Sequence, residues 1–175
     1  MEFVVLVDEY NNEIGTAPKD TVHSDHTPLH RAFSLFIFNS KNKLLVTRRA
    51  ATKKTFPDVW TNTVCGHPAS GEDAADAAKR RLKDELGIIS HDIKVQEVSP
   101  YQYRFADKNG IVENEICPIL VAFHDGDPIP NLQEVGKWKW MPWREFLAEI
   151  QNIPGKYSPW CVEEAKILFD RKLVP

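Results

Sequence analysis

The segment from Asn62 to Ile88 constrains the fold most, because it joins a short apolar stretch, a Cys-Gly-His-Pro turn and an alanine-rich stretch. Residues 59–64 predict a strand that leads into Cys65, and residues 71–86 predict a helix with an apolar stripe. Gly87 is a natural C-terminal cap for that helix. The order strand, loop, helix therefore predicts a mixed α/β structure built around this loop.

Cys65 and His67 lie two positions apart in the loop. In an extended segment such residues point to the same face, so both side chains can enter one pocket. A thiol with a tuned pKa is a nucleophile or a proton carrier. An imidazole is a metal ligand or a general base. The pattern alone leaves open which of these roles each residue takes.

The rest of the chain alternates between short strand patterns and further helical ones. Residues 32–38 show period-two alternation, with Phe33, Leu35 and Ile37 on one face. Strands are expected at residues 3–7, 14–17, 32–38, 44–48, 93–105, 111–123 and 138–142, loops at 18–30 and 49–58, and further helices at 143–150 and 159–168. No long linker interrupts these elements, so we expect one α/β domain over residues 1–175.

Charge and cysteine content exclude several classes of protein. The net charge of −3 gives no basic field for nucleic acid or an anionic membrane. Three widely spaced cysteines form neither a disulfide framework nor a zinc-binding pair, which favours a reducing cytoplasm. The apolar run at residues 3–7 is too short for a signal peptide or a membrane span.

The loop and helix after Cys65 resemble the Nudix box, a loop–helix–loop that holds a divalent metal against a diphosphate. The matching residues are Gly66, Glu72, Arg80, Leu82, Glu85, Gly87 and Ile88. Two positions depart, because Arg81 and Asp84 stand where the Nudix hydrolases have glutamates. Arg81 replaces a metal-binding carboxylate with a cation, which suits holding a diphosphate more than cutting it. The alternative is an ordinary amphipathic helix with a glycine cap.

Three histidines and two glutamates suggest a mixed nitrogen and oxygen site for a divalent ion. They are His23, His30, His67, Glu113 and Glu115. Spacing alone does not bring four segments together, and a lone histidine is more often a surface or core group. His26, His91 and His124 are expected to be surface groups, and Cys117 and Cys161 structural ones.

The chain as a whole resembles the type I isopentenyl-diphosphate isomerases of the Nudix superfamily. The resemblance runs from about Val4 to Trp160 and rests on residues 23–30, 45–49, 60–68, 103–104, 110–115 and 158–160. It implies a Nudix-like α/β/α sandwich with mixed central sheets. It also implies a metal-dependent isomerase that acts on a five-carbon diphosphate, as a monomer or weak homodimer, without nucleic acid or membrane partners.

The resemblance also assigns roles to individual residues. Cys65 matches the active-site thiol, Glu115 the carboxylate opposite it, Tyr103 a group that supports proton delivery, and Trp160 an aromatic beside the reacting carbons. The metal site matches His23, His30, His67, Glu113 and Glu115 and would hold Mn²⁺, Zn²⁺ or Mg²⁺. Glu85 and the carbonyl of Cys65 match a second site, for Mg²⁺ on the diphosphate. The basic residues around the diphosphate match Lys19, Arg49, Lys53 and Arg81.

These residue types suit a double-bond shift. One proton is added at one carbon and another leaves two carbons away, through a cationic transition state that an aromatic face such as that of Trp160 can stabilise. We expect Glu115 as the acid and a Cys65 thiolate as the base, with His67 occupied as a metal ligand. Trp160 is alternatively an ordinary core residue. A Nudix hydrolase of a nucleoside diphosphate derivative and a non-catalytic metal-binding module are the competing functions.

Overall fold

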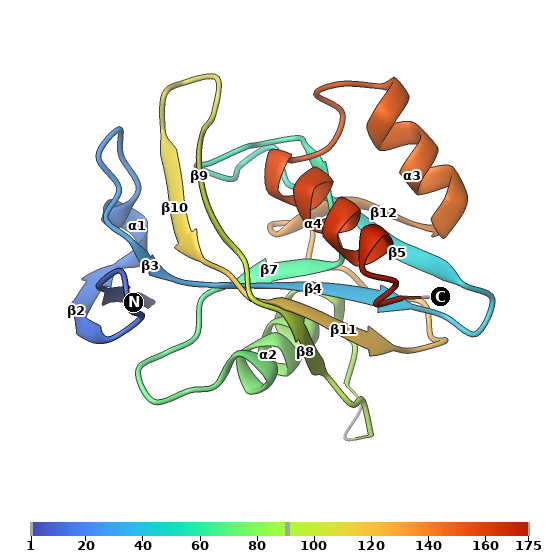
Figure 1. The fold of residues 1–175 in the computed structure, drawn as a ribbon, viewed down its shortest axis with the longest axis horizontal. Helices are drawn as coiled ribbons and strands as arrows, with labels where there is room; N and C mark the ends of the chain where they lie inside the picture. The colour runs from blue at the N-terminus through green and yellow to red at the C-terminus, as the bar shows by residue number, and fades with distance from the viewer. Residues whose placement is uncertain (1, 90–91, 175) are drawn as a thin grey trace.

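The computed structural model describes residues 2–89 and 92–174 and contains two β-sheets with helices around them (Figure 1). In the described chain one sheet has the strand order β2-β1-β3-β10-β9 and the other β12-β5-β4-β11-β8, with β6 and β7 added beside β5 and β4. The strands of the first sheet are β1 (Phe3–Val7), β2 (Glu13–Pro18), β3 (His30–Arg31), β9 (Gln102–Ala106) and β10 (Val112–Ile116). Those of the second are β4 (Phe33–Phe38), β5 (Lys43–Arg49), β6 (Trp60–Thr61), β7 (Val64–Gly66), β8 (Gln96–Ser99), β11 (Ile119–Phe123) and β12 (Val135–Pro142).

Strand β4 separates the two apolar cores, as its alternation predicts. Phe33, Leu35 and Ile37 pack in the cluster beneath helix α2 (Ala74–Leu86). Phe36 and Phe38, on the opposite face, pack in the cluster that contains residues of α3 (Trp143–Asn152) and α4 (Pro159–Asp170). The second sheet is thus covered by α2 on one face and by α3 and α4 on the other (Figure 1), which confirms the α/β/α sandwich.

The prediction of two long strands at residues 93–105 and 111–123 is wrong. Each is divided, the first into β8 and β9 and the second into β10 and β11, and each half joins a different sheet. The breaks lie at Pro100 and at Cys117-Pro118. Proline has no backbone N–H and cannot continue a ladder in the middle of a sheet. The chain therefore crosses between sheets at both points.

Other boundaries differ by a few residues. Helix α2 begins at Ala74, not at Gly71, because the Asp73 side chain accepts a hydrogen bond from the Asp76 backbone N–H at 2.8 Å. Residues 59–64 form parts of β6 and β7, with a break between them. The expected loop at 18–30 contains the short helix α1 (Lys19–Val22) and ends in β3. His26 is exposed, His124 is half-buried, and His91 lies outside the described residues.

Gly87 ends α2 in the left-handed conformation, with φ of 62°. A Cβ atom at this position would lie 2.8 Å from the Ile129 carbonyl oxygen, so no larger residue fits without a shift. The loop that carries Ile129 is thereby held against the end of α2. In the described part of the chain no helix is long and apolar enough to cross a membrane.

We expect Leu82→Ala to lower the free energy of unfolding by about 2–5 kcal/mol, because Leu82 is 1 % exposed in the core beneath α2. Urea unfolding followed by circular dichroism measures this change. Leu132→Ala is the matched control, since Leu132 is 72 % exposed and the same methyl groups are removed. Equal losses for the two variants would show that α2 is not packed as described.

Candidate functional site

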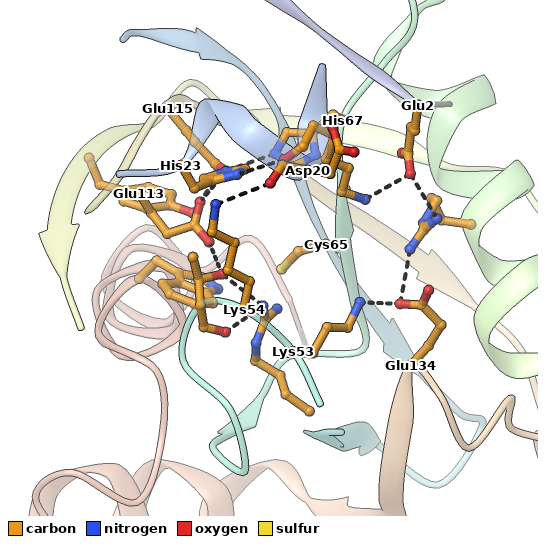
Figure 2. A pocket seen from close by; sticks show the side chains of 17 residues that line it. Glu2, Asp20, His23, Lys53, Lys54, Cys65, His67, Glu113, Glu115 and Glu134 are labelled. Atoms are coloured by element: carbon orange, nitrogen blue, oxygen red, sulfur yellow. Dashed lines mark hydrogen bonds and ion pairs between the residues drawn. The ribbon is translucent and has the colours of Figure 1, made fainter. Parts of the chain in front are cut away.

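A cavity of about 370 Å³ opens where α1, the loop after β5, β7, β10 and α4 meet. All the predicted site residues line it except His30, which is fully buried behind it, and Glu85. Figure 2 shows Cys65 between two groups of charged side chains, with His67 and Glu115 on one side and Lys53 and Glu134 on the other.

The metal cluster predicted from the sequence is assembled in the structure. It consists of His23, His30, His67, Glu113 and Glu115, and one ligand atom from each lies within 4.8 Å of all the others. His23 Nε2 lies 3.1 Å from Glu113 Oε2. Glu115 Oε1 lies 3.1 Å from His67 Nε2 and 3.4 Å from His30 Nε2. All five residues are buried.

Backbone contacts orient two of the imidazoles as ligands. His23 Nδ1 lies 3.3 Å from the Lys19 carbonyl oxygen, and His30 Nδ1 lies 2.9 Å from that of Pro28. Because a carbonyl oxygen only accepts, Nδ1 donates and Nε2 keeps its lone pair. Both Nε2 atoms are buried without a hydrogen-bond partner in the described structure. Such atoms are costly to leave unpaired, so a divalent ion fits this cluster.

Burial and neighbouring charges set the protonation of the cluster. Burial lowers the pKa of His67 to about 4 despite its hydrogen bond with Glu115, so the imidazole is neutral. Burial alone would raise the pKa of Glu115, but the neighbouring His30 and His67 imidazoles hold it well below its usual range. Neutral imidazole and ionised carboxylate are the forms that bind metals.

Tyr103 is tied to the same carboxylate. Burial, followed by the Glu115 charge, raises the pKa of Tyr103 well above its usual value. The phenol therefore keeps its proton and donates to Glu115 Oε2 at 2.6 Å. The register of the strands explains this contact, because Tyr103 in β9 lies directly opposite Glu115 in β10.

Cys65 lies at the edge of the cavity with a polar group on either side. Its thiol donates to Asn62 Oδ1 at 3.1 Å, and the Ser34 hydroxyl lies 3.4 Å from its Sγ. Burial, followed by the charge of Glu164, raises the pKa of Cys65 to about 12. These surroundings favour the thiol, which differs from the thiolate expected from the sequence.

Behind Cys65 lies a buried pair that the sequence did not indicate. The Ser34 hydroxyl also lies 3.4 Å from Cys117 Sγ, which in turn lies 4.0 Å from Glu164 Oε1. Glu164 is fully buried, and burial raises its pKa well above the usual range. A glutamate in the middle of a helix gives no sequence sign of such a position. Cys117 and Cys161 are both buried, as structural cysteines should be.

Aromatic rings form the apolar wall of the cavity. Trp160 is 1 % exposed, stacks on Tyr103 with ring centroids 5.6 Å apart, and meets the edge of Phe56 at 4.9 Å. The guanidinium of Arg49 lies 5.7 Å from the Trp160 ring. Trp160 is therefore both a core residue and part of the cavity wall, so the two interpretations from the sequence are compatible.

Basic residues line the other end of the cavity, and three of the four already have carboxylate partners. Lys19 Nζ lies 2.9 Å from Glu2 Oε2, and Lys53 pairs with Glu134. Arg81 pairs with Glu85 at 2.5 Å. Glu85 also lines a smaller adjoining cavity, together with Cys65 and Glu134. Carboxylate and carbonyl oxygens suit Mg²⁺ there. Glu2 and Glu134 were missed from the sequence because they follow no pattern.

The remaining Nudix-box acid faces away from the cavity. Glu72 receives two hydrogen bonds from Arg80, at 2.9 and 2.8 Å, and one from the Ala69 N–H at 2.8 Å. Asp84 is exposed on α2. In the described residues Glu85 is therefore the one acid of α2 that reaches the site. Gly66 is closely packed here, because a Cβ atom on it would lie 3.0 Å from the Arg81 side chain and 3.2 Å from the Phe33 ring.

The fold is that of known Nudix proteins. Residues 28–161 match the family model of the NUDIX domain. The structure superposes on DR0079 from Deinococcus radiodurans with a TM-score of 0.76 and 20 % identity, over 94 % of this chain and 98 % of that one. The NUDIX domain of Shewanella oneidensis NrtR, crystallised with ADP ribose, gives a TM-score of 0.60 at 15 % identity, over 82 % and 87 % of the two chains.

Closer relatives are found by sequence. The chain is 46 % identical over 171 residues to the isopentenyl-diphosphate Delta-isomerase of Saccharopolyspora erythraea, which covers 97 % of this chain and 87 % of the relative. It is 48 % identical over 168 residues to that of Corynebacterium glutamicum, covering 94 % and 89 %. With this identity along nearly its whole length and a NUDIX domain at its centre, the chain belongs to the isopentenyl-diphosphate Delta-isomerase family of the Nudix superfamily.

Proposed function

We propose that this protein interconverts isopentenyl diphosphate and dimethylallyl diphosphate by adding a proton at one carbon and removing another two carbons away. One observation supports this most: the Cys65 thiol and the Glu115 carboxylate, which accepts a hydrogen bond from Tyr103, line the same cavity. Two proton carriers on one substrate are what a double-bond shift requires.

Cys65 and the Glu115–Tyr103 pair are the two proton carriers. The hydrogen bonds of Cys65 to Asn62 and Ser34 fix its Sγ at the cavity edge. Tyr103 fixes Glu115 and keeps one proton at hand on its phenol. A carrier that donates its proton in the forward reaction is left deprotonated. In the reverse reaction the same carrier therefore accepts a proton. The resting thiol is the donating form of Cys65.

Trp160 faces the carbon that becomes cationic. A cation over a desolvated aromatic face is stabilised by about 2 kcal/mol or more. That is worth at least about tenfold in rate, so the ring assists but does not account for catalysis. The stacking of Trp160 on Tyr103 holds the ring in place and excludes water from the reacting carbons.

The His/Glu cluster is proposed to hold Mn²⁺, Zn²⁺ or Mg²⁺, and Glu85 with the Cys65 carbonyl to hold Mg²⁺. A divalent ion bound at the cluster would withdraw electron density from Glu115 and so make the proton of its hydrogen-bond partner, the Tyr103 phenol, more acidic. Lys19, Arg49, Lys53 and Arg81 orient the diphosphate, since Arg forks match phosphate geometry. This fixes which carbons reach Cys65 and Glu115.

Hydrolysis of a nucleoside diphosphate derivative is less well supported. A Nudix hydrolase needs several helix carboxylates on its metals, whereas Glu72 is bound to Arg80 and Arg81 occupies the place of a glutamate. Release of phosphate from a panel of such substrates would favour hydrolysis instead.

We expect Cys65→Ala to reduce isomerisation at least about a hundredfold, because one of the two proton carriers is lost. The measurement is deuterium incorporation from D₂O into the five-carbon diphosphate. Cys161→Ala is the control, since Cys161 is a buried thiol that does not line the cavity. Full incorporation by Cys65→Ala would exclude a proton-carrying role.

We expect Tyr103→Phe to lower kcat by about tenfold or more, because the ring still stacks on Trp160 but the hydrogen bond to Glu115 is lost. The matched control is Tyr101→Phe, which removes a phenol that donates to Glu163 at 2.6 Å, outside the cavity. Equal kcat for both variants and the wild type would show that Tyr103 only packs.

The metal site is testable without activity. We expect His23→Ala and His30→Ala to lower the metal content per chain well below that of the wild type, measured by elemental analysis after dialysis. His26→Ala is the control, because the His26 side chain is 88 % exposed and lies outside the cluster. Unchanged metal content in both cluster variants would mean that the ligand set is wrong.

A further inference from the structure

One oxygen atom links two of the cations at the charged end of the cavity. Glu134 Oε2 accepts from Lys53 Nζ and from Arg81 Nη2, the latter at 3.3 Å. Figure 2 shows Glu134 and Lys53 meeting below Cys65. A bridging phosphate oxygen of a ligand would make the same two contacts, so Glu134 occupies the role that such an oxygen would take.

The backbone fixes Glu134 in this position. Its carbonyl oxygen accepts from the Ala50 N–H at 3.0 Å, and the Ala50 carbonyl accepts from the Lys53 N–H at 3.1 Å. The loop before Glu134 is held to α2, because the Asn131 N–H donates to the Glu85 carbonyl at 2.8 Å. Lys53, Glu85 and Glu134 are thus mounted on one hydrogen-bonded frame.

The carboxylates beside these cations leave this end of the cavity only weakly positive. Lys19, Lys53 and Arg81 each have a carboxylate partner, whereas among the described residues Arg49 donates to neutral oxygens of Phe56 and Thr55. A free diphosphate carries several negative charges, and it would meet Glu134 directly. A diphosphate with bound Mg²⁺ carries two fewer, and its cation can face a carboxylate oxygen.

We propose that Glu134 makes this end of the cavity select a magnesium-bound diphosphate over the free diphosphate anion. The proposal rests on the assignment of Lys19, Arg49, Lys53 and Arg81 to the diphosphate. Glu134 repels the free anion, since the pairs around it are only about a quarter exposed and are weakly screened. When the ligand arrives with Mg²⁺, Glu134 faces the cation and releases Lys53 and Arg81 to the phosphate oxygens.

The test is calorimetric binding of inorganic diphosphate to the metal-loaded enzyme, with and without Mg²⁺, at low ionic strength. The wild type is expected to bind the magnesium complex more tightly than the free anion. Glu134→Gln keeps the shape and removes the charge. We expect this substitution to lower the Kd for free diphosphate about tenfold and to change the Kd for the magnesium complex by less than about threefold. The resident metal is assayed before and after, because diphosphate chelates metals.

Two controls make the outcomes separable. Glu149→Gln removes the same charge from α3, where Glu149 pairs with Lys156 outside the cavity, and should leave the preference unchanged. Glu134→Asp keeps the charge and should keep most of the preference. If the wild type binds neither form, the diphosphate assignment is wrong. If it binds both but Glu134→Gln has the wild-type preference, or matches Glu149→Gln, the role of Glu134 is overturned.

Discussion

The parallel pairing of β10 with β3 is the contact on which the site depends. It sets Glu115 opposite His30, while β9 sets Tyr103 opposite Glu115 from the other side. A buried carboxylate needs charged or hydrogen-bonded partners on every side. The strand register supplies two of them, and His67 arrives from the loop after β7. Without this pairing the ionised Glu115 would not remain inside the protein.

The sequence predicted the elements whose patterns are local. The alternation over residues 32–38 gave both faces of β4, and the apolar stripe and Gly87 gave the extent of α2 to within three residues. It did not predict that two apparent strands would change sheets. Pro100 and Pro118 marked the breaks, but which sheet each half joins depends on pairing between distant segments, which no local pattern records.

The candidate site divides in the same way. The five metal-cluster residues were assembled from the family resemblance, because they come from four separate segments. Glu134 and Glu164 were missed for opposite reasons. Glu134 is a glutamate in a polar loop, where most carboxylates are solvated, and Glu164 lies on a helix next to the exposed Glu163. Only the tertiary fold turns one to the cavity and buries the other behind Cys65.

The division of labour between Cys65 and His67 follows from the contacts of the imidazole. His67 Nε2 is engaged with Glu115, and burial lowers the pKa of His67 to about 4, so the imidazole is a poor base for the Cys65 thiol. The thiol instead contacts the Asn62 amide and the Ser34 hydroxyl, which form hydrogen bonds but do not take up its proton. A thiol–imidazole pair like that of the cysteine proteases would keep the cysteine as a thiolate nucleophile for attack on a carbonyl. In the proposed mechanism the Cys65 thiol keeps its proton until the substrate binds and then transfers that proton to carbon without a covalent intermediate.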